Sequence, residues 1–414
     1  MLYNSILSGP KTMLYQPDRH QPLTGPTWDP ELARTTIVRL LTSTLDAYSP
    51  IDRWPLPIAA EVGENWQGQP PTSIYLGAMG VLWVLDYLQD YLPTELSFDK
   101  QQLALDLYQQ YFNSEGRVFA GDDGLLPSYL LGETGILLVL GKLVPSTKVT
   151  NRTRQMRLIE KNISNPTLEP LWGGTGSVIP LLFDLEAELS QASEDLFVSH
   201  CEFMKSKLTK DTATGSPIWT QDLYGEKRCY TGAGHGFAGN IYPFIRGRSF
   251  LPADLAQWSL DTAVDMIVKT AVVEGDCANW PSLLGVQDPQ RPRFRVQWCH
   301  GAPGVIVALN DIPIGYNQDF DKLMLKAGET IWQAGPLHKG VNLCHGTDGN
   351  GFAFLKLHER TGDPKWLERA RAFAMHALAQ TNNRHALWDG DLSLPCFLHA
   401  CLTQEGGFPL LDIC

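Results

Sequence analysis

Two short stretches of the sequence carry residue types that could bind a metal or activate a thiol. Cysteine, histidine and glycine follow one another at Cys299-His300-Gly301 and again at Cys344-His345-Gly346. A further histidine, His235, also stands directly before a glycine. Thiolates and imidazoles are the ligands that zinc prefers in proteins. These residues can form one site only if the fold brings them together.

The two stretches belong to a repeated pattern in which Gly-x-x-Gly runs directly into an apolar segment. Successive copies begin 41 to 65 residues apart, an interval that fits a pair of helices with their loops. The glycines are expected to allow positive φ and a close approach between helices. The last copy is degraded, because Ser393 replaces its second glycine. The copies begin at Gly77, Gly132, Gly173, Gly236, Gly301, Gly346 and Gly390.

The segments between the copies predict a helical repeat protein. Stretches such as Pro252–Val272 and Pro364–Gln380 place apolar residues at helical spacing with charges on the other face. The runs after the glycines are apolar nearly all round, as in helices buried on every side. Each unit is therefore an exposed outer helix and a buried inner helix. About seven such hairpins in a ring bury the inner helices against one another, so the predicted fold class is all-α, an α/α toroid, with an open α-solenoid as the alternative. Residues 1–34 are predicted as a Pro-rich lead-in and residues 35–414 as one domain.

Composition excludes several classes of function. The 414 residues include 43% hydrophobic and 19% charged residues, as in an ordered globular protein. A net charge of −12 leaves no basic stripe for nucleic acid. The N-terminus lacks a secretory signal, and no apolar run is long enough to span a membrane. The eight scattered cysteines are expected to be thiols. These features predict a cytoplasmic protein without a transmembrane segment and leave peripheral association with a membrane open.

Repeat geometry predicts that the reactive residues converge. Equivalent positions of successive units lie side by side at one end of a ring, so His235, Cys299, His300, Cys344 and His345 should surround one patch. Cys299, Cys344 and His345 together would hold one zinc ion and leave the fourth tetrahedral position open, as catalytic sites do. Two thiolates make zinc a poor Lewis acid for water and favour activation of a third thiol. The alternative is that the cysteines are small buried hydrophobes and the histidines belong to the core.

The sequence resembles the LanC-like family, relatives of the lanthionine synthetase cyclases. The resemblance rests on Gly234-His235-Gly236, on Trp298–Gly304 (W-C-H-G-A-P-G) and on Leu343–Gly346 (L-C-H-G), and is stronger to the eukaryotic-type branch. It implies an α/α toroid with zinc on Cys299, Cys344 and His345 and a thiol as the exchangeable ligand. In bacterial members that thiol is a peptide cysteine that attacks dehydroalanine or dehydrobutyrine. Eukaryotic-type members are associated with glutathione.

The same resemblance implies roles for further residues. His235 matches the histidine that handles the proton in the addition, and Arg295 matches an arginine that stabilises the enolate oxygen. Lys339 matches a lysine near the thiol, where glutathione could dock. Glu169 stands where the bacterial enzymes have an aspartate. His300 is expected to support a metal ligand from behind or to contact the substrate, since one tetrahedral site does not need both histidines. For Arg295, Lys339 and Glu169 the alternative is that they are ordinary solvated charges.

The leading hypothesis is a zinc-dependent enzyme that adds a thiol, with glutathione as co-substrate, to dehydroamino acids in peptides or proteins. A non-catalytic adaptor or signalling protein that binds zinc and glutathione is the alternative. The presence of His235 and Arg295 favours the enzyme, because a pure binder needs no proton donor. A third hypothesis is a toroidal glycosidase with paired carboxylates.

Overall fold

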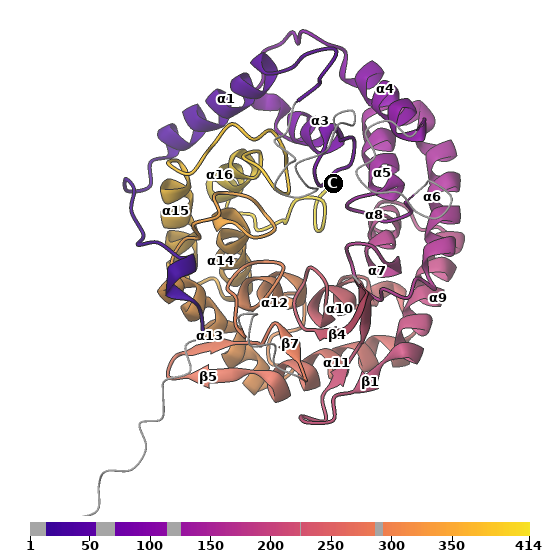
Figure 1. The fold of residues 1–414 in the computed structure, drawn as a ribbon, viewed down its shortest axis with the longest axis vertical. Helices are drawn as coiled ribbons and strands as arrows, with labels where there is room; N and C mark the ends of the chain where they lie inside the picture. Colours follow the sequence, from indigo (N-terminus) through magenta and orange to yellow (C-terminus); the bar gives the residue numbers. More distant parts are fainter. Residues whose placement is uncertain (1–13, 55–70, 114–125, 224, 286–292) are drawn as a thin grey trace, which may run out of the picture.

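The helices of the protein form a closed ring of two concentric layers (Figure 1). The structure, a computed structural model, describes residues 14–54, 71–113, 126–223, 225–285 and 293–414. The predicted all-α toroid is confirmed. The inner layer consists of α3 (Ala78–Tyr87), α5 (Glu133–Leu143), α7 (Gly174–Ser177) with α8 (Ile179–Ala187), α10 (Phe237–Arg246), α12 (Ala302–Leu309), α14 (Thr347–Thr361) and α16 (Ser393–Thr403). The outer layer consists of α1 (Pro30–Asp46), α4 (Lys100–Phe112), α6 (Lys148–Asn162), α9 (Gln191–Lys207), α11 (Ala253–Thr270), α13 (Gln318–Ala334) and α15 (Pro364–Ala377).

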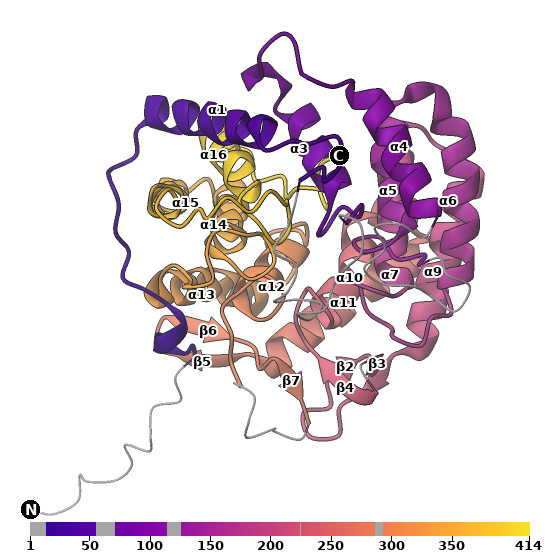
Figure 2. The same ribbon diagram turned by 45° about the horizontal axis from the view of Figure 1, so that its top comes forward.

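The two ends of the chain close the ring. The first outer helix, α1, packs against the last inner helix, α16, as both views show (Figures 1 and 2). Helix α1 begins at Pro30, inside the segment predicted as a lead-in, and the division at residue 35 stays a prediction. The described residues before it run along the ring, where His20 Nδ1 lies 2.9 Å from the carbonyl oxygen of Gly335. The N–H of Thr24 donates to His376 Nδ1.

Inner and outer helices begin in different ways. Outer helices such as α1 and α15 are capped by the aspartates Asp29 and Asp363, whose carboxylates accept backbone N–H groups of the first turn. The inner helices α3, α5, α7, α10, α12 and α14 begin after a glycine, which offers no side-chain cap, whereas α16 begins after Leu392. N–H groups at the start of these helices can donate to the preceding loop instead. The N–H of Asp348, for example, donates to the carbonyl oxygen of Val341 at 2.8 Å. Each inner helix and the loop before it are therefore one hydrogen-bonded unit.

The expectation that the glycines adopt positive φ is wrong for all but one of the copies. Among the first glycines, only Gly301 has positive φ, at 97°, whereas Gly77 and Gly346 are extended at −128° and −111°. Close approach is the general reason for glycine. A Cβ atom on Gly80 would lie 2.4 Å from the carbonyl oxygen of Ile74, closer than any real contact. The loop folds back beneath the first turn of the inner helix and leaves no room for a side chain.

Strands are short and lie between the helices in the described ranges. All pairs are antiparallel: β1 pairs with β2, β4 lies between β3 and β7 and pairs with both, and β5 pairs with β6. No helix in those ranges is both long and apolar enough to cross a bilayer. The strands are β1 (Thr209–Lys210), β2 (Pro217–Ile218), β3 (Gln221–Leu223), β4 (Glu226–Tyr230), β5 (Val272–Glu274), β6 (Cys277–Asn279) and β7 (Leu283–Leu284).

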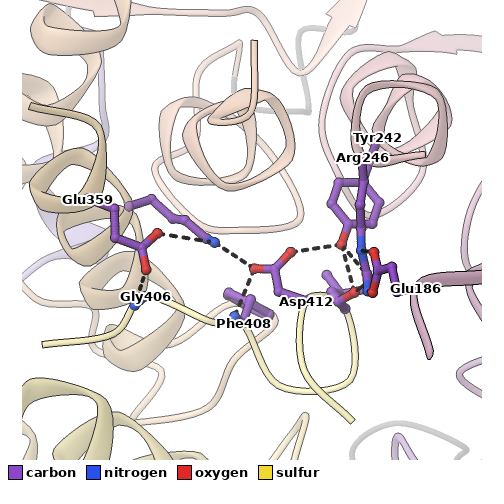
Figure 3. Close-up of polar contacts among 9 residues, drawn as sticks. Glu186, Tyr242, Arg246, Glu359, Gly406, Phe408 and Asp412 are labelled. Atoms are coloured by element: carbon purple, nitrogen blue, oxygen red, sulfur yellow. Dashed lines mark hydrogen bonds and ion pairs between the residues drawn. The ribbon is translucent and has the colours of Figure 1, made fainter. Parts of the chain in front are cut away.

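The C-terminal segment, residues 404–414 after α16, lies in the centre of the ring (Figure 1). Asp412 accepts hydrogen bonds there from Tyr242 of α10 at 2.8 Å and from Lys356 of α14 at 2.9 Å (Figure 3). Arg246, the last residue of α10, donates to the carbonyl oxygen of Leu411. The segment therefore joins α10 and α14, the two inner helices that flank α12.

Candidate active site at the mouth of the ring

The loops that precede the inner helices are hydrogen-bonded to one another around one end of the ring. The N–H of Gly234 donates to the carbonyl oxygen of Cys299 at 3.1 Å, and the N–H of Cys299 donates to that of Cys344 at 3.0 Å. The series continues from the N–H of Cys344 to the carbonyl oxygen of Trp388 at 3.2 Å. These bonds fix the register of neighbouring loops, so side chains at equivalent positions meet.

A cavity of about 390 Å³ opens at this end of the ring, a size within the range of small-molecule sites. Six loops each contribute the two residues that precede the first glycine of their copy. The loops before α3, α5 and α7 make an apolar half, and those before α10, α12 and α14 make a polar half. The cavity is lined by Tyr75, Leu76, Leu130, Leu131, Leu171, Trp172, Gly234, His235, Arg295, Gln297, Trp298, Cys299, His300, Lys339, Cys344 and His345.

The two cysteines of the polar half are in contact. Cys299 and Cys344 are both 8% exposed, and their thiols are hydrogen-bonded to each other. The bond from Cys344 lowers the pKa of Cys299 to about 6, against the opposing effect of burial. The same contact and burial raise the pKa of Cys344. The contact therefore favours ionisation of Cys299 and disfavours ionisation of Cys344.

A second contact holds the Cys299 sulfur from the other side. The amide nitrogen of Gln297 donates to Sγ of Cys299 at 2.9 Å, and Arg19 donates to the amide oxygen of Gln297 at 2.7 Å. A buried amide with both ends engaged has one favourable orientation. The segment before α1 thus reaches into the active-site mouth through Arg19.

His345 lies between this cavity and a smaller one of about 110 Å³. Its Nε2 is 3.1 Å from Oδ1 of Asp389, a carboxylate that is 3% exposed. The guanidinium of Arg384 contacts the other oxygen of Asp389. One ring nitrogen of His345 is therefore held by a buried, charge-paired carboxylate.

His235 faces the cysteines from the loop before α10 and is bonded to Glu169. Its Nδ1 lies 2.8 Å from Oε2 of Glu169, which is fully buried. The Glu169 carboxylate also accepts the backbone N–H groups of Leu171, Trp172 and Gly173, so its position is fixed by the turn before α7. Burial lowers the pKa of His235, but the hydrogen bond and charge of Glu169 outweigh it, and the pKa is raised. Glu169 is not among the residues lining the cavity, and it contacts the cavity wall at His235.

The other three predicted residues also lie at the cavity. His300 is 7% exposed, with ring centroids 6.1 Å from His235 and 5.9 Å from Tyr230. Burial lowers the pKa of His300 well below its ordinary value, so it is neutral. Arg295 is half-buried and Lys339 is exposed at the edge, where Lys339 also borders the smaller cavity.

Sequence reasoning missed Gln297, Arg19 and Asp389. Asp389 had a usable signal, because it directly precedes Gly390 just as His235, His300 and His345 precede the first glycines of their copies. Gln297 and Arg19 had none, since neither occupies a repeated position.

The donor set fits zinc in its chemistry. Two sulfurs in contact and an imidazole on the same cavity are a Cys2His set, and a carboxylate on the second nitrogen of the histidine is common where histidine binds a metal. Within the described ranges, no group of three or more His, Cys, Asp or Glu side chains already has the arrangement to hold a metal ion. Zinc at this site is therefore an inference from the residues.

Comparison with known proteins identifies the family. The profile described as "Lanthionine synthetase C-like protein" matches residues 58–391. The chain belongs to this family. Over 185 residues it is 36% identical to "Glutathione S-transferase LANCL1" of Danio rerio, a stretch that covers 44% of this chain and 40% of that protein. Over 83 residues it is 42% identical to "LanC-like protein GCL1" of Arabidopsis thaliana, covering 20% of this chain and 19% of that one. The matched stretches thus span less than half of these relatives.

The fold has a solved counterpart. The structure titled "Nisin cyclase" superposes with a TM-score of 0.57 at 16% identity, covering 91% of this chain and 98% of that chain. This likeness shows that the LanC-like chain shares the toroid of that cyclase.

Proposed function

We propose that this LanC-like protein is a zinc-dependent enzyme that adds the thiol of glutathione to dehydroalanine or dehydrobutyrine residues of peptides or proteins. The observation that carries the proposal is that the two cysteines, His345 and His235 line one cavity together. Family membership and the name of the zebrafish relative support the class of reaction and the thiol. Zinc bound by Cys299, Cys344 and His345 would supply a site at which a thiol loses its proton and stays nucleophilic.

The protein's own residues account for the remaining steps. The thiolate sulfur bonds to the β-carbon of the dehydroamino acid, and the electron pair of the double bond moves through the α-carbon to the carbonyl oxygen. Arg295, at the cavity wall, stabilises the negative charge of this enolate. His235 then gives its proton to the α-carbon. Because Nδ1 of His235 is held by Glu169, the proton leaves from Nε2.

The two halves of the cavity suit the two substrates. Glutathione carries two carboxylates and a thiol, and Lys339 and Arg295 border the polar half where its thiol would bind. The apolar half, with Leu131 and Trp172, suits the side chains that flank the dehydroamino acid in the acceptor. Thiol and acceptor therefore approach from opposite sides of the mouth.

Incubation of the purified, zinc-loaded protein with glutathione and a dehydroalanine peptide tests the proposal. Mass spectrometry should show a peptide heavier by one glutathione, and Cys344→Ala should abolish its formation. Cys201→Ala is the matched control, since Cys201 is an equally small, fully buried thiol on the outer helix α9. Absence of adduct with zinc-loaded wild-type protein would refute the enzymatic role.

A further inference from the structure

Asp389 occupies the register position that histidine holds in the three preceding units. It comes directly before Gly390, as His345 comes before Gly346. The backbone hydrogen bond from Cys344 to Trp388 places the Asp389 loop beside the His345 loop. The last and most degraded copy of the repeat thus places a carboxylate beside the loop that carries His345.

The surroundings of Asp389 keep its carboxylate in one place. Only 3% of the residue is exposed, and the guanidinium of Arg384 contacts one oxygen. Asp391 holds the loop by accepting the backbone N–H groups of Asn382 and Asn383 at 2.7 and 2.6 Å. A buried carboxylate is costly unless it is paired and hydrogen-bonded, and this one is both.

The contact with His345 selects one form of the imidazole. Oδ1 of Asp389 is 3.1 Å from Nε2, and a carboxylate can only accept there, so the ring proton of neutral His345 is on Nε2. Its lone pair is then on Nδ1, the nitrogen that remains for a metal. Of these two cavities Asp389 lines the smaller alone, whereas His345 also lines the one that holds the cysteines. Asp389 therefore lies behind the ring of His345.

We propose that Asp389 is a positioning residue that fixes the tautomer and orientation of His345 for metal binding. The proposal rests on the proposed function, in that the metal is zinc on Cys299, Cys344 and His345. Partners of this kind typically change metal affinity about 10- to 100-fold when they are removed. Arg384 supports the arrangement by neutralising the charge of Asp389.

Zinc affinity measured by competition with a chromophoric chelator tests this role. Asp389→Ala should weaken zinc binding about 10- to 100-fold, and Asp389→Asn, whose amide oxygen can still accept a hydrogen bond, should lose less. The matched control is Asp391→Asn, which alters a buried carboxylate of the same loop that accepts backbone N–H groups rather than a histidine. Equal losses in Asp389→Ala and Asp391→Asn would assign the effect to the loop and overturn the proposal. Unchanged affinity in Asp389→Ala would overturn it as well.

The tautomer gives a second readout that needs neither zinc nor activity. Ring nitrogen shifts of His345 in metal-free protein labelled with ¹⁵N-histidine, assigned by comparison with His345→Gln, should show the proton on Nε2. In Asp389→Ala the two tautomers should mix. A proton on Nδ1 in the wild-type protein would refute the inference. If the wild-type protein bound no zinc, the proposed function would fail, while this measurement would still decide whether Asp389 orients His345.

Discussion

Replacement of Glu169 by glutamine would show how the site sets the charge of His235. The carboxylate of Glu169 is fully buried and lies 2.8 Å from Nδ1 of His235. Glutamine has nearly the same shape, and its amide oxygen can still accept backbone N–H groups such as that of Trp172. The turn before α7 should therefore persist, and what is lost is the negative charge that favours a protonated imidazole.

The size of the effect follows from that one contact. A hydrogen bond to a charged group contributes about 1.5–3 kcal/mol, and about 1.4 kcal/mol is a factor of ten in an equilibrium. Glu169→Gln should thus reduce the protonated fraction of His235 roughly 10- to 100-fold at pH values above the pKa. Burial lowers the pKa of His235 and Glu169 raises it, so the pKa of His235 falls when the carboxylate is removed.

Removal of the Glu169 carboxylate should shift the pH dependence of the rate toward acid. Protonated His235 is present below its pKa and is lost as the pH rises through it. The rate of the wild-type enzyme should therefore persist to higher pH than the rate of Glu169→Gln, with little difference in acid. Loss of the whole proton transfer, as in His235→Gln, should cost about 10²- to 10⁴-fold.

Initial rates of glutathione adduct formation from about pH 5.5 to pH 9, a range that brackets histidine titration, provide the assay. Glu133→Gln is the matched control, because Glu133 is also a fully buried carboxylate but pairs with Arg154 at 2.9 Å, away from the cavity. An equal loss at every pH in Glu169→Gln would mean that Glu169 serves only the fold. An unchanged profile would refute the conclusion that Glu169 sets the charge of His235, and an unchanged rate in His235→Gln would refute proton transfer by His235.

Two further predictions concern the acceptor and the stability of the ring. Trp172→Ala, in the apolar half of the cavity, should raise KM for dehydroalanine peptides with flanking apolar residues and leave zinc content unchanged, as steady-state kinetics and metal analysis would show. Asp412→Ala should lower the free energy of unfolding by about 3–5 kcal/mol, because it leaves the buried ammonium of Lys356 without that partner. Burial opposes ionisation of Asp412, but Lys356 outweighs it and lowers the pKa. Asp412 therefore stabilises the protein above the ordinary aspartate pKa, and denaturant titrations should show this contribution disappearing in the wild type as the pH falls below that range.

The toroidal fold could be predicted from the sequence because the pattern that indicates it is local and recurs in each unit. Apolar runs after glycine distinguish inner from outer helices, and their spacing sets the number of units. Equivalence between units then places His235, Cys299 and Cys344 at one mouth, since the backbone hydrogen bonds between loops keep their register.

The contacts of individual side chains at the site could not be predicted from the repeat. Nothing in the spacing indicates that Glu169 bonds His235 rather than facing the cavity, because the turn that fixes its carboxylate is held by backbone N–H groups. Arg19 lies in a segment that the repeat does not describe, and its reach to Gln297 depends on how that segment crosses the ring. Asp389 was overlooked because its copy lacks the second glycine, although the loop itself keeps its register.

The ring therefore holds the loops in register, so that the two residues before the first glycine of six copies line the cavity. Backbone hydrogen bonds link the loops in series, from Gly234 through Cys299 and Cys344 to Trp388. A shift of one loop should therefore move the cysteine and histidine side chains of the next loop. The C-terminal segment packs against the same loops. The ring centroid of Phe408 lies 5.6 Å from that of Trp298 and 5.7 Å from that of Trp388. Both tryptophans directly precede residues of the site. The packing that closes the ring therefore also positions the two thiols. Substitutions in the C-terminal segment should for this reason change the positions of Cys299 and Cys344.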